Sequence, residues 1–175
     1  GGGGKTKIQI ARESISELAQ AVGRTGPCTM SDRSGCDQIR LGLGRFSNSA
    51  SIDVKPAENS YATVDTTVDG YNASGGTYMG AAAKLLFESN ELKNAERQGV
   101  GVLITDGAPS SKGTVEQTIH YNCAMRDRMP GAVPNYAVGF GSGADPDTNS
   151  LFAAAGGTGE CCAGSRRRKR AGSRP

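Results

Sequence analysis

The chain has 175 residues, which is enough for one domain with a hydrophobic core and too few for two. No stretch approaches the ~20 consecutive apolar residues that a membrane-spanning helix needs. The formal charge of +3 is unevenly distributed: residues 165–175 hold six of the 20 basic residues and no acidic one, so the rest carries 14 basic against 17 acidic side chains. We therefore expect one mildly acidic domain over residues 1–164, followed by a basic, disordered tail over residues 165–175.

The first predicted element is an amphipathic helix. From residue 8 to residue 22 apolar side chains recur at spacings of three and four, with charged residues between them. This spacing predicts a helix of about 18 residues that stops near Gly23. Its inward face is expected to consist of Ile8, Ala11, Ile15, Leu18 and Val22.

A turn-rich loop and a β-hairpin are predicted next. Residues 38–46 alternate apolar and polar or glycine positions, which is the period of a strand. Residues 50–54 form a second, short strand, paired with the first through the turn at 47–49, and Pro56 is expected to end it. Residues 57–76 are polar and irregular, with one helical turn around 60–67.

A helix that begins at Thr77 is predicted to continue as far as Arg97. The strand that follows, residues 100–105, is apolar at both alternating positions, which predicts a parallel strand covered by helices on both sides. The side chains expected on one face of the helix are Met79, Ala82, Ala83, Leu86 and Phe87.

Two further helices and a strand complete the pattern. Thr114 and Gln117 are predicted to form a capping box for a helix with Val115, Ile119 and Cys123 directed inward. Residues 135–140 form a strand, and Asp145-Pro146 begins a short helix that ends at Gly156. The alternation of strands and helices predicts an α/β fold, doubly wound around a mainly parallel sheet with helices on both faces.

The cysteines bear on the compartment. Several disulfides stay open. Cys28 could pair with Cys36, and Cys161 or Cys162 could pair with Cys123 or with a partner chain. The odd total leaves at least one thiol unpaired within the chain. None of the spacings resembles a zinc site. Five cysteines in a loop-rich chain favour an oxidising compartment, so we expect an extracellular or cell-surface location.

Two segments indicate a binding site. The strand at 100–105 ends abruptly in Asp106 and Gly107, and ligands collect at the carboxyl ends of strands in parallel sheets. About 29 residues earlier the sequence SGGTYMG at 74–80 places a hydroxyl, that of Thr77, after two glycines and at the start of a helix. A carboxylate and a hydroxyl suit a hard divalent cation; by itself, Asp106 would equally well cap a turn with Gly107.

From residue 5 to residue 157 the chain resembles the von Willebrand factor type A (vWA) domain, also called the integrin I-like domain. The matching segments are the first helix, IRLGLGRF at 39–46, GGT at 75–77, LITDG at 103–107 and YAVGFG at 136–141. The resemblance implies a doubly wound, Rossmann-type fold and a metal-ion-dependent adhesion site. It assigns Thr77 as a hydroxyl ligand and Asp106 as a carboxylate ligand of Mg²⁺ or Mn²⁺, with an acidic side chain of a partner completing the site.

The chain also departs from the family pattern. The family's first strand ends in Asp-x-Ser-x-Ser, whereas residues 1–4 here are glycines, and nothing after Gly164 resembles the family's last strand and helix. The absent first strand would lie at the centre of the sheet, between the strands that end at Phe46 and at Thr105. We therefore expect a domain that is incomplete at both ends, with weak metal binding or none.

Three other candidates are rejected. Asp32-Arg33-Ser34 resembles the absent motif, but no apolar strand precedes it and Cys36 would be a poor ligand for a hard cation. The segment that starts at Asp145 lacks the glycine and glutamate of a calcium loop, and we interpret it as a helix cap. His120 is the only histidine, which excludes a catalytic pair of histidines within one chain.

The function expected is therefore a non-enzymatic protein-binding or adhesion module. One alternative is a vWA-like subunit of a metal-chelatase-like or other enzymatic assembly, although no phosphate loop, nucleophile–base pair or carboxylate dyad is visible. A second is binding of nucleic acid or an anionic surface through the basic tail, which the absence of aromatic residues from the tail disfavours.

Overall fold

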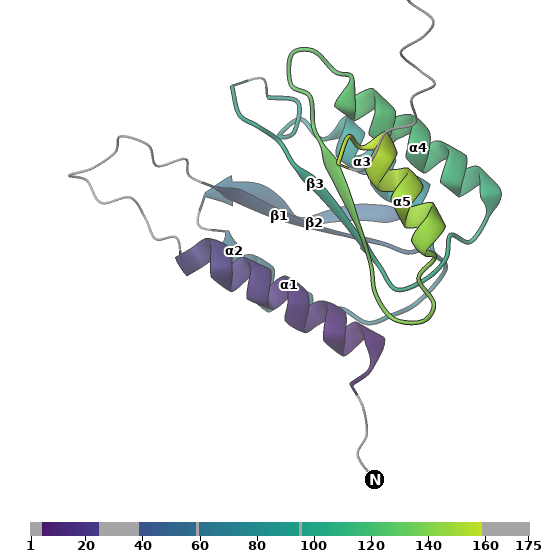
Figure 1. The fold of residues 1–175 in the computed structure, drawn as a ribbon. Coiled ribbons are helices and arrows are strands. Elements are labelled where there is room, and N and C mark those ends of the chain that lie inside the picture. Colours follow the sequence, from purple (N-terminus) through teal and green to yellow (C-terminus); the bar gives the residue numbers. More distant parts are fainter. Residues whose placement is uncertain (1–4, 25–38, 59, 95, 159–175) are drawn as a thin grey trace, which may run out of the picture.

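The computed structural model describes residues 5–24, 39–58, 60–94 and 96–158, and shows a mixed α/β fold (Figure 1). The elements in chain order are α1 (Lys7–Arg24), β1 (Arg40–Phe46), β2 (Ala50–Glu58), α2 (Tyr61–Asp69), α3 (Met79–Glu88), β3 (Gly101–Thr105), α4 (Lys112–Arg126), β4 (Asn135–Gly139) and α5 (Pro146–Ala155). The predicted tail, the segment from Asp32 to Cys36, and all cysteines except Cys123 lie outside the described residues.

The predicted hairpin is confirmed, but the prediction that Pro56 ends its second strand is wrong. β2 runs antiparallel to β1 and continues to Glu58. The register shifts between Leu41 and Leu43, where β2 carries an extra residue opposite β1. A Cβ at Gly42 would lie 2.7 Å from the Pro56 ring, so glycine leaves the space that the ring fills. Proline is tolerated because a bulge does not need its missing N–H.

Helices α1 and α2 cover the β1–β2 pair and enclose the first hydrophobic core (Figure 1). This core consists of Ala19, Leu43, Val54, Val64 and Val68. The expected inward face of α1 is only partly right, because Leu18 is 46% exposed.

The face of α1 that lies towards α2 also carries polar contacts. Ser16 hydrogen-bonds the carboxylate of Asp65 on α2, and Arg12 hydrogen-bonds the carbonyl of Tyr71. Residues 12, 15, 16 and 19 form one face at helical spacing, and Leu18 lies beside that face rather than within it. Hydrophobic spacing alone could not indicate these polar partners.

Strands β3 and β4 form a separate, parallel pair, in register from Gly101 opposite Asn135 to Thr105 opposite Gly139. One face of the pair packs against α3, α4 and α5 through a second core that contains Met79, Ala82, Leu103 and Phe152. The other face leaves Val102, Tyr136 and Val138 45–49% exposed. The prediction that helices cover this strand on both sides is therefore wrong for the described residues, in which α1 and α2 pack on the other strand pair instead.

The α/β class is thus confirmed, whereas the single, mainly parallel sheet is not observed in the described part of the chain. That part contains two sheets of two strands each, one antiparallel and one parallel. The carboxyl ends of β1, β3 and β4 lie at the same end of the molecule, close to the start of α1 (Figure 1).

The boundaries of three helices depart from prediction. α2 extends over Tyr61–Asp69, beyond the single turn expected, and α3 ends at Glu88 rather than at Arg97. The N-cap of α4 is Ser111, whose side chain accepts from the backbone N–H of Thr114. Thr114 is therefore not the cap: it is buried, and its hydroxyl oxygen accepts from the backbone N–H of Gly80 on α3 at 2.8 Å.

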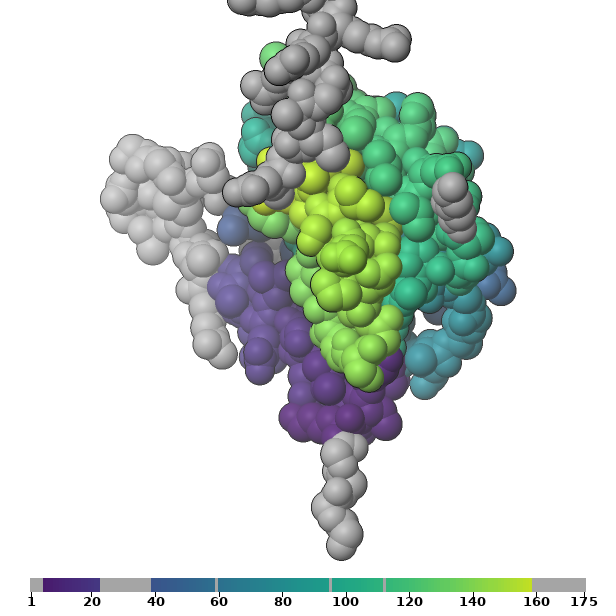
Figure 2. Space-filling model, turned by 45° about the vertical axis from the view of Figure 1, so that its right-hand side comes forward, coloured from purple at the N-terminus to yellow at the C-terminus, as the bar shows by residue number. Residues whose placement is uncertain are grey.

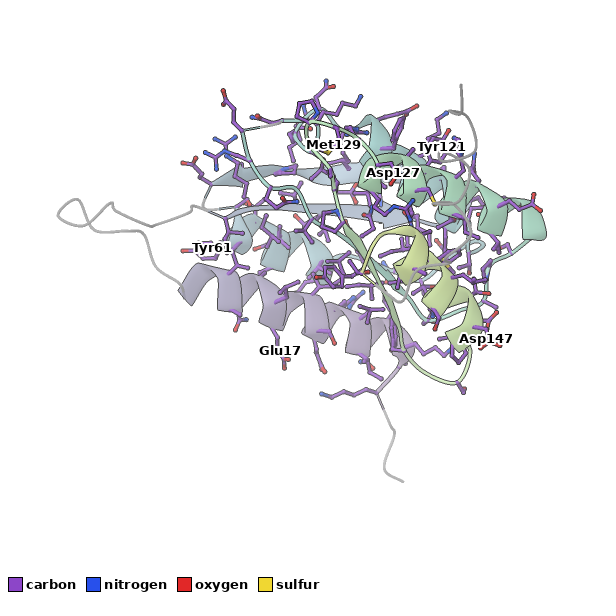
Figure 3. The ribbon with its side chains drawn as sticks, turned by 45° about the horizontal axis from the view of Figure 1, so that its top comes forward. Glu17, Tyr61, Tyr121, Asp127, Met129 and Asp147 are labelled. Carbon is purple, nitrogen blue, oxygen red and sulfur yellow. The ribbon has the colours of Figure 1, made fainter. Side chains whose placement is uncertain are left out.

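The end of the described chain agrees with prediction. β4 occupies Asn135–Gly139, and the carboxylate of Asp145 accepts from the backbone N–H groups of Asp147 and Thr148 at the start of α5. Figure 3 shows Asp147 in this first turn of α5, at the opposite end of the molecule from Met129.

Candidate functional site

Thr77 and Asp106 belong to two loops that meet at the carboxyl ends of the strands. The backbone N–H of Thr77 donates to Ser110 Oγ at 2.5 Å, and the N–H of Ser110 donates to the carbonyl of Thr77 at 3.1 Å. A Cβ at Gly107 would lie 3.3 Å from Thr77 Oγ1. The hydroxyl of Thr77 therefore lies beside the loop that carries Asp106. We call the surface formed by these two loops, around Thr77, Asp106, Gly107 and Ser110, the rim.

The two glycines before Thr77 pack against the β1–β2 turn. The N–H of Gly76 donates to Asn48 Oδ1 at 2.8 Å, and the N–H of Tyr78 donates to the carbonyl of Ser47 at 2.9 Å. Gly75 has a φ of +80°, a conformation that glycine adopts without strain. The expected close approach of backbone thus occurs, and its partner is a turn that the sequence reasoning did not include in the site.

The carboxylate of Asp106 lies at the end of β3 with its side chain 46% exposed. Thr105 Oγ1 accepts from the N–H of Gly107 at 3.3 Å and donates to the carbonyl of Gly107 at 3.1 Å. These bonds of Thr105 hold the turn after the strand, whereas the carboxylate of Asp106 pairs with Lys7.

Lys7, in the first turn of α1, contacts Asp106 and was not identified from the sequence. Its Nζ donates to the carbonyl of Asp106 at 3.1 Å and lies 3.7 Å from the Oδ2 of the same residue. The two residues are 99 positions apart, and one lysine among the 20 basic residues carries no signal of such a contact.

The loop between β4 and α5 forms the other wall beside Lys7. A Cβ at Gly143 would lie 2.7 Å from Lys7 Nζ and 2.8 Å from the carbonyl oxygen of Asp106. Gly141 has a φ of +73°, and a Cβ there would lie 3.4 Å from Lys7 Cε. Figure 2 shows the same proximity: the start of α1 (purple) lies directly below the start of α5 (yellow-green).

The donors at the rim do not by themselves fit a divalent cation. Mg²⁺ and Mn²⁺ require about six oxygen ligands, several of which are usually waters, around at least one available carboxylate. The rim offers the carboxylate of Asp106, which already pairs with the ammonium of Lys7, and the hydroxyls of Thr77 and Ser110, of which Ser110 Oγ already accepts from the backbone N–H of Thr77. Within the described ranges no group of three or more His, Cys, Asp or Glu side chains could hold a metal ion.

The other residues considered from the sequence lie away from this arrangement. His120 is exposed on α4, with its ring edge-on to Tyr121 at 5.1 Å between centroids. Cys123 is half-buried on the same helix. Hydrogen bonds from the hydroxyl and the backbone N–H of Thr148 lower the pKa of Asp145, which fits a helix cap.

An open cavity of about 330 Å³ lies at the other end of the β3–β4 pair. It is lined by residues 96–98 and 129–132, including Met129, which is 84% exposed. It contributes nothing to the rim. Among the described helices, none combines the length and apolar character that crossing a bilayer requires.

The described fold is that of a mixed α/β domain with a rim of loops at the carboxyl ends of its strands. No family model matches the sequence, and no curated protein matches it. Among solved structures, the fold is similar to that of an aerotolerance-related membrane protein from Bacteroides fragilis that carries multiple mutations to serines. The TM-score is 0.59 at 16% sequence identity, over 86% of this chain and 78% of that chain, so the likeness is one of fold alone.

Proposed function

We propose that this chain is a non-enzymatic protein-binding module with a doubly wound, vWA-like fold, which binds an acidic side chain of a partner at its rim. The sequence resemblance to vWA domains and the likeness of fold to the Bacteroides protein support the fold assignment. The cysteine content supports a location outside the cytoplasm, on the cell surface or beyond it.

The observation that carries the proposal is the meeting of Thr77, Asp106 and Lys7 at one rim. Hydrogen bonds join the two loops through Thr77 and Ser110 and join Lys7 to the carbonyl of Asp106, so the polar groups are positioned before a ligand arrives. Pre-positioned groups bind more tightly because less conformational entropy is lost on association. Both Lys7 and Asp106 are about half exposed, which leaves them accessible to a partner.

An array of immobilised peptides, each carrying one Asp or Glu, tests the proposal when every peptide has a matched copy with Asn or Gln. We expect the purified chain to be retained on a subset of acidic peptides and on none of their amide copies. Asp106→Ala should reduce retention at least tenfold, because it removes the carboxylate that pairs with the Lys7 ammonium at 3.7 Å and helps to orient it at the rim. The fold should persist, since the side chain of Asp106 is half exposed.

Equal retention on acidic and amide peptides would contradict the proposal. So would Asp106→Ala protein that binds like the unmodified chain. A matched control is Asp69→Ala at the end of α2, which removes a carboxylate from a helix that contributes no contact to the rim.

A further inference from the structure

We propose that Lys7 is a tethered cation that takes the place of a divalent ion at Asp106, so that the rim binds an acidic group without metal. This inference rests on the proposed function, because it specifies how the same rim would bind its ligand. It begins from a disagreement: the resemblance to vWA domains implies Mg²⁺ or Mn²⁺ beside Asp106, whereas the structure has an ammonium group there.

The position of this ammonium is determined by contacts along the whole side chain of Lys7. The stem lies against the backbone of Gly141, where a Cβ would be 3.4 Å from Cε and 4.0 Å from Cδ and Cγ. The tip lies against Gly143, and Nζ donates to the carbonyl of Asp106. Gly143 thus leaves the room that the tip of the lysine side chain occupies, because a Cβ there would meet both Nζ and the Asp106 carbonyl oxygen, whereas the stem is in ordinary contact with Gly141.

The ammonium keeps capacity for a ligand. A lysine has three N–H donors, and one of them is used by the carbonyl of Asp106. Nζ also lies 3.7 Å from Asp106 Oδ2, but the side chain of Lys7 is 46% exposed, so the ammonium still presents N–H groups to a carboxylate that approaches from solvent. A charge-assisted hydrogen bond between ammonium and carboxylate is stronger than one between neutral groups. Lys7 therefore supplies, from the chain itself, one positive charge at the place where a bound divalent ion would supply two.

The same charge opposes a metal. A divalent ion on the carboxylate of Asp106 would lie a few ångströms from the Lys7 ammonium, and like charges at that separation repel even when they are hydrated. We expect this repulsion, together with the loss of the Lys7–Asp106 pair, to lower affinity for Mn²⁺ by about tenfold or more.

Calorimetric titration with Mn²⁺ alone tests this prediction on four proteins: the unmodified chain, Lys7→Met, Lys7→Arg and Lys5→Met. We expect Lys7→Met to bind Mn²⁺ at least tenfold more tightly than the unmodified chain. Lys7→Arg keeps the charge and should resemble the unmodified chain. Lys5→Met is the matched control, because Lys5 pairs with Glu13 instead of the rim. Far-ultraviolet circular dichroism verifies that each variant is folded.

The inference is overturned if Lys7→Met binds Mn²⁺ no more tightly than the unmodified chain. It is also overturned if the unmodified chain binds Mn²⁺ with micromolar affinity. No partner is present in this titration, so its result does not depend on the proposed function.

The peptide array, repeated with the chelator EDTA, provides the second measurement. We expect retention on acidic peptides to be unchanged by EDTA and to fall at least tenfold with Lys7→Met. Retention that EDTA abolishes and Lys7→Met leaves intact would overturn the inference while the proposed function stands. Absence of retention for every protein would refute the proposed function, and the Mn²⁺ titration would still decide the role of Lys7.

Discussion

The two halves of the molecule are built differently. The first half, α1, α2, β1 and β2, has a core of small aliphatic residues and many polar connections between its elements. Tyr71 is an example: its hydroxyl donates to Asp53 at 2.6 Å, and burial together with this hydrogen bond raises the pKa of the tyrosine. The second half, α3, α4, α5, β3 and β4, packs larger side chains such as Phe152 and Met79.

Each half has its own sheet, and the rim is one of the places where they meet. Lys7 connects α1 to the end of β3, and Asn48 connects the β1–β2 turn to the loop before α3. Phe46 and Ala50, at the two ends of the same turn, pack against the second core. The candidate site therefore lies at the junction of the two halves, so its geometry depends on how both halves pack.

The largest difference between the halves should appear on truncation of a buried side chain. Phe152→Ala removes a fully buried ring from the second core and should cost about 3–5 kcal/mol of unfolding free energy. Val64→Ala removes two methyl groups from the first core and should cost roughly 1–2 kcal/mol, at about 0.8 kcal/mol for each buried carbon. Urea denaturation followed by circular dichroism measures both. Equal losses would contradict the contrast between the two cores.

An intermediate loss of stability is expected at Gly143, where the loop between β4 and α5 lies against the backbone of Asp106. Gly143→Ala would place a Cβ 2.8 Å from the carbonyl oxygen of Asp106, which is backbone and moves only at a cost. We expect a loss of about 1–3 kcal/mol in unfolding free energy, as for other overpacked sites, together with weaker binding at the rim.

Gly113→Ala in α4 is the matched control for this substitution. A Cβ there meets nothing within 4 Å, and alanine favours a helix, so the protein should gain up to about 1 kcal/mol. Chemical denaturation measures the unfolding free energy of both variants. If Gly143→Ala were as stable as Gly113→Ala, the loop between β4 and α5 would not pack against Asp106 as described.

The smallest effect concerns the cap of α5 in the second half. The native pKa of Asp145 is lowered by its bonds to Thr148, so its ionised form stabilises the fold. That contribution is present above the unfolded-state pKa of about 4 and is lost as pH falls through the lower native value. Asp145→Asn also caps a helix but does not titrate, so its stability should fall less between about pH 4 and pH 2. Melting temperatures across this range test it, and parallel curves for the two proteins would contradict it.

Much of the local structure was predictable because its signals lie within a few residues. The 18-residue helix α1, the β1–β2 hairpin, the strand before Asp106 and the Asp145-Pro146 cap follow from periodicity and capping chemistry. Asp106 was also placed at the carboxyl edge of the sheet by the rule for parallel strands, whereas Thr77 was assigned beside it through the resemblance to vWA domains. Whether they bind a cation or a partner stays a prediction.

The failures share one cause, which is contact between distant residues. Pro56 lies within β2 because a bulge opposite Gly42 accommodates it, and Leu18 is exposed beside a face of α1 that makes polar contacts with α2. Thr114 is buried against Gly80 instead of capping α4. Periodicity describes which side chains share a face, but not which neighbour that face will meet.

The sequence by itself determined where helices and strands begin, within a few residues, and which hydroxyl and carboxylate end up near the strand termini. Only the tertiary structure decided that the strands form two pairs and that Lys7 reaches Asp106 across 99 positions. The physical reason is that an ammonium is placed by the packing of its whole helix, and here also by the room that Gly143 leaves beside it.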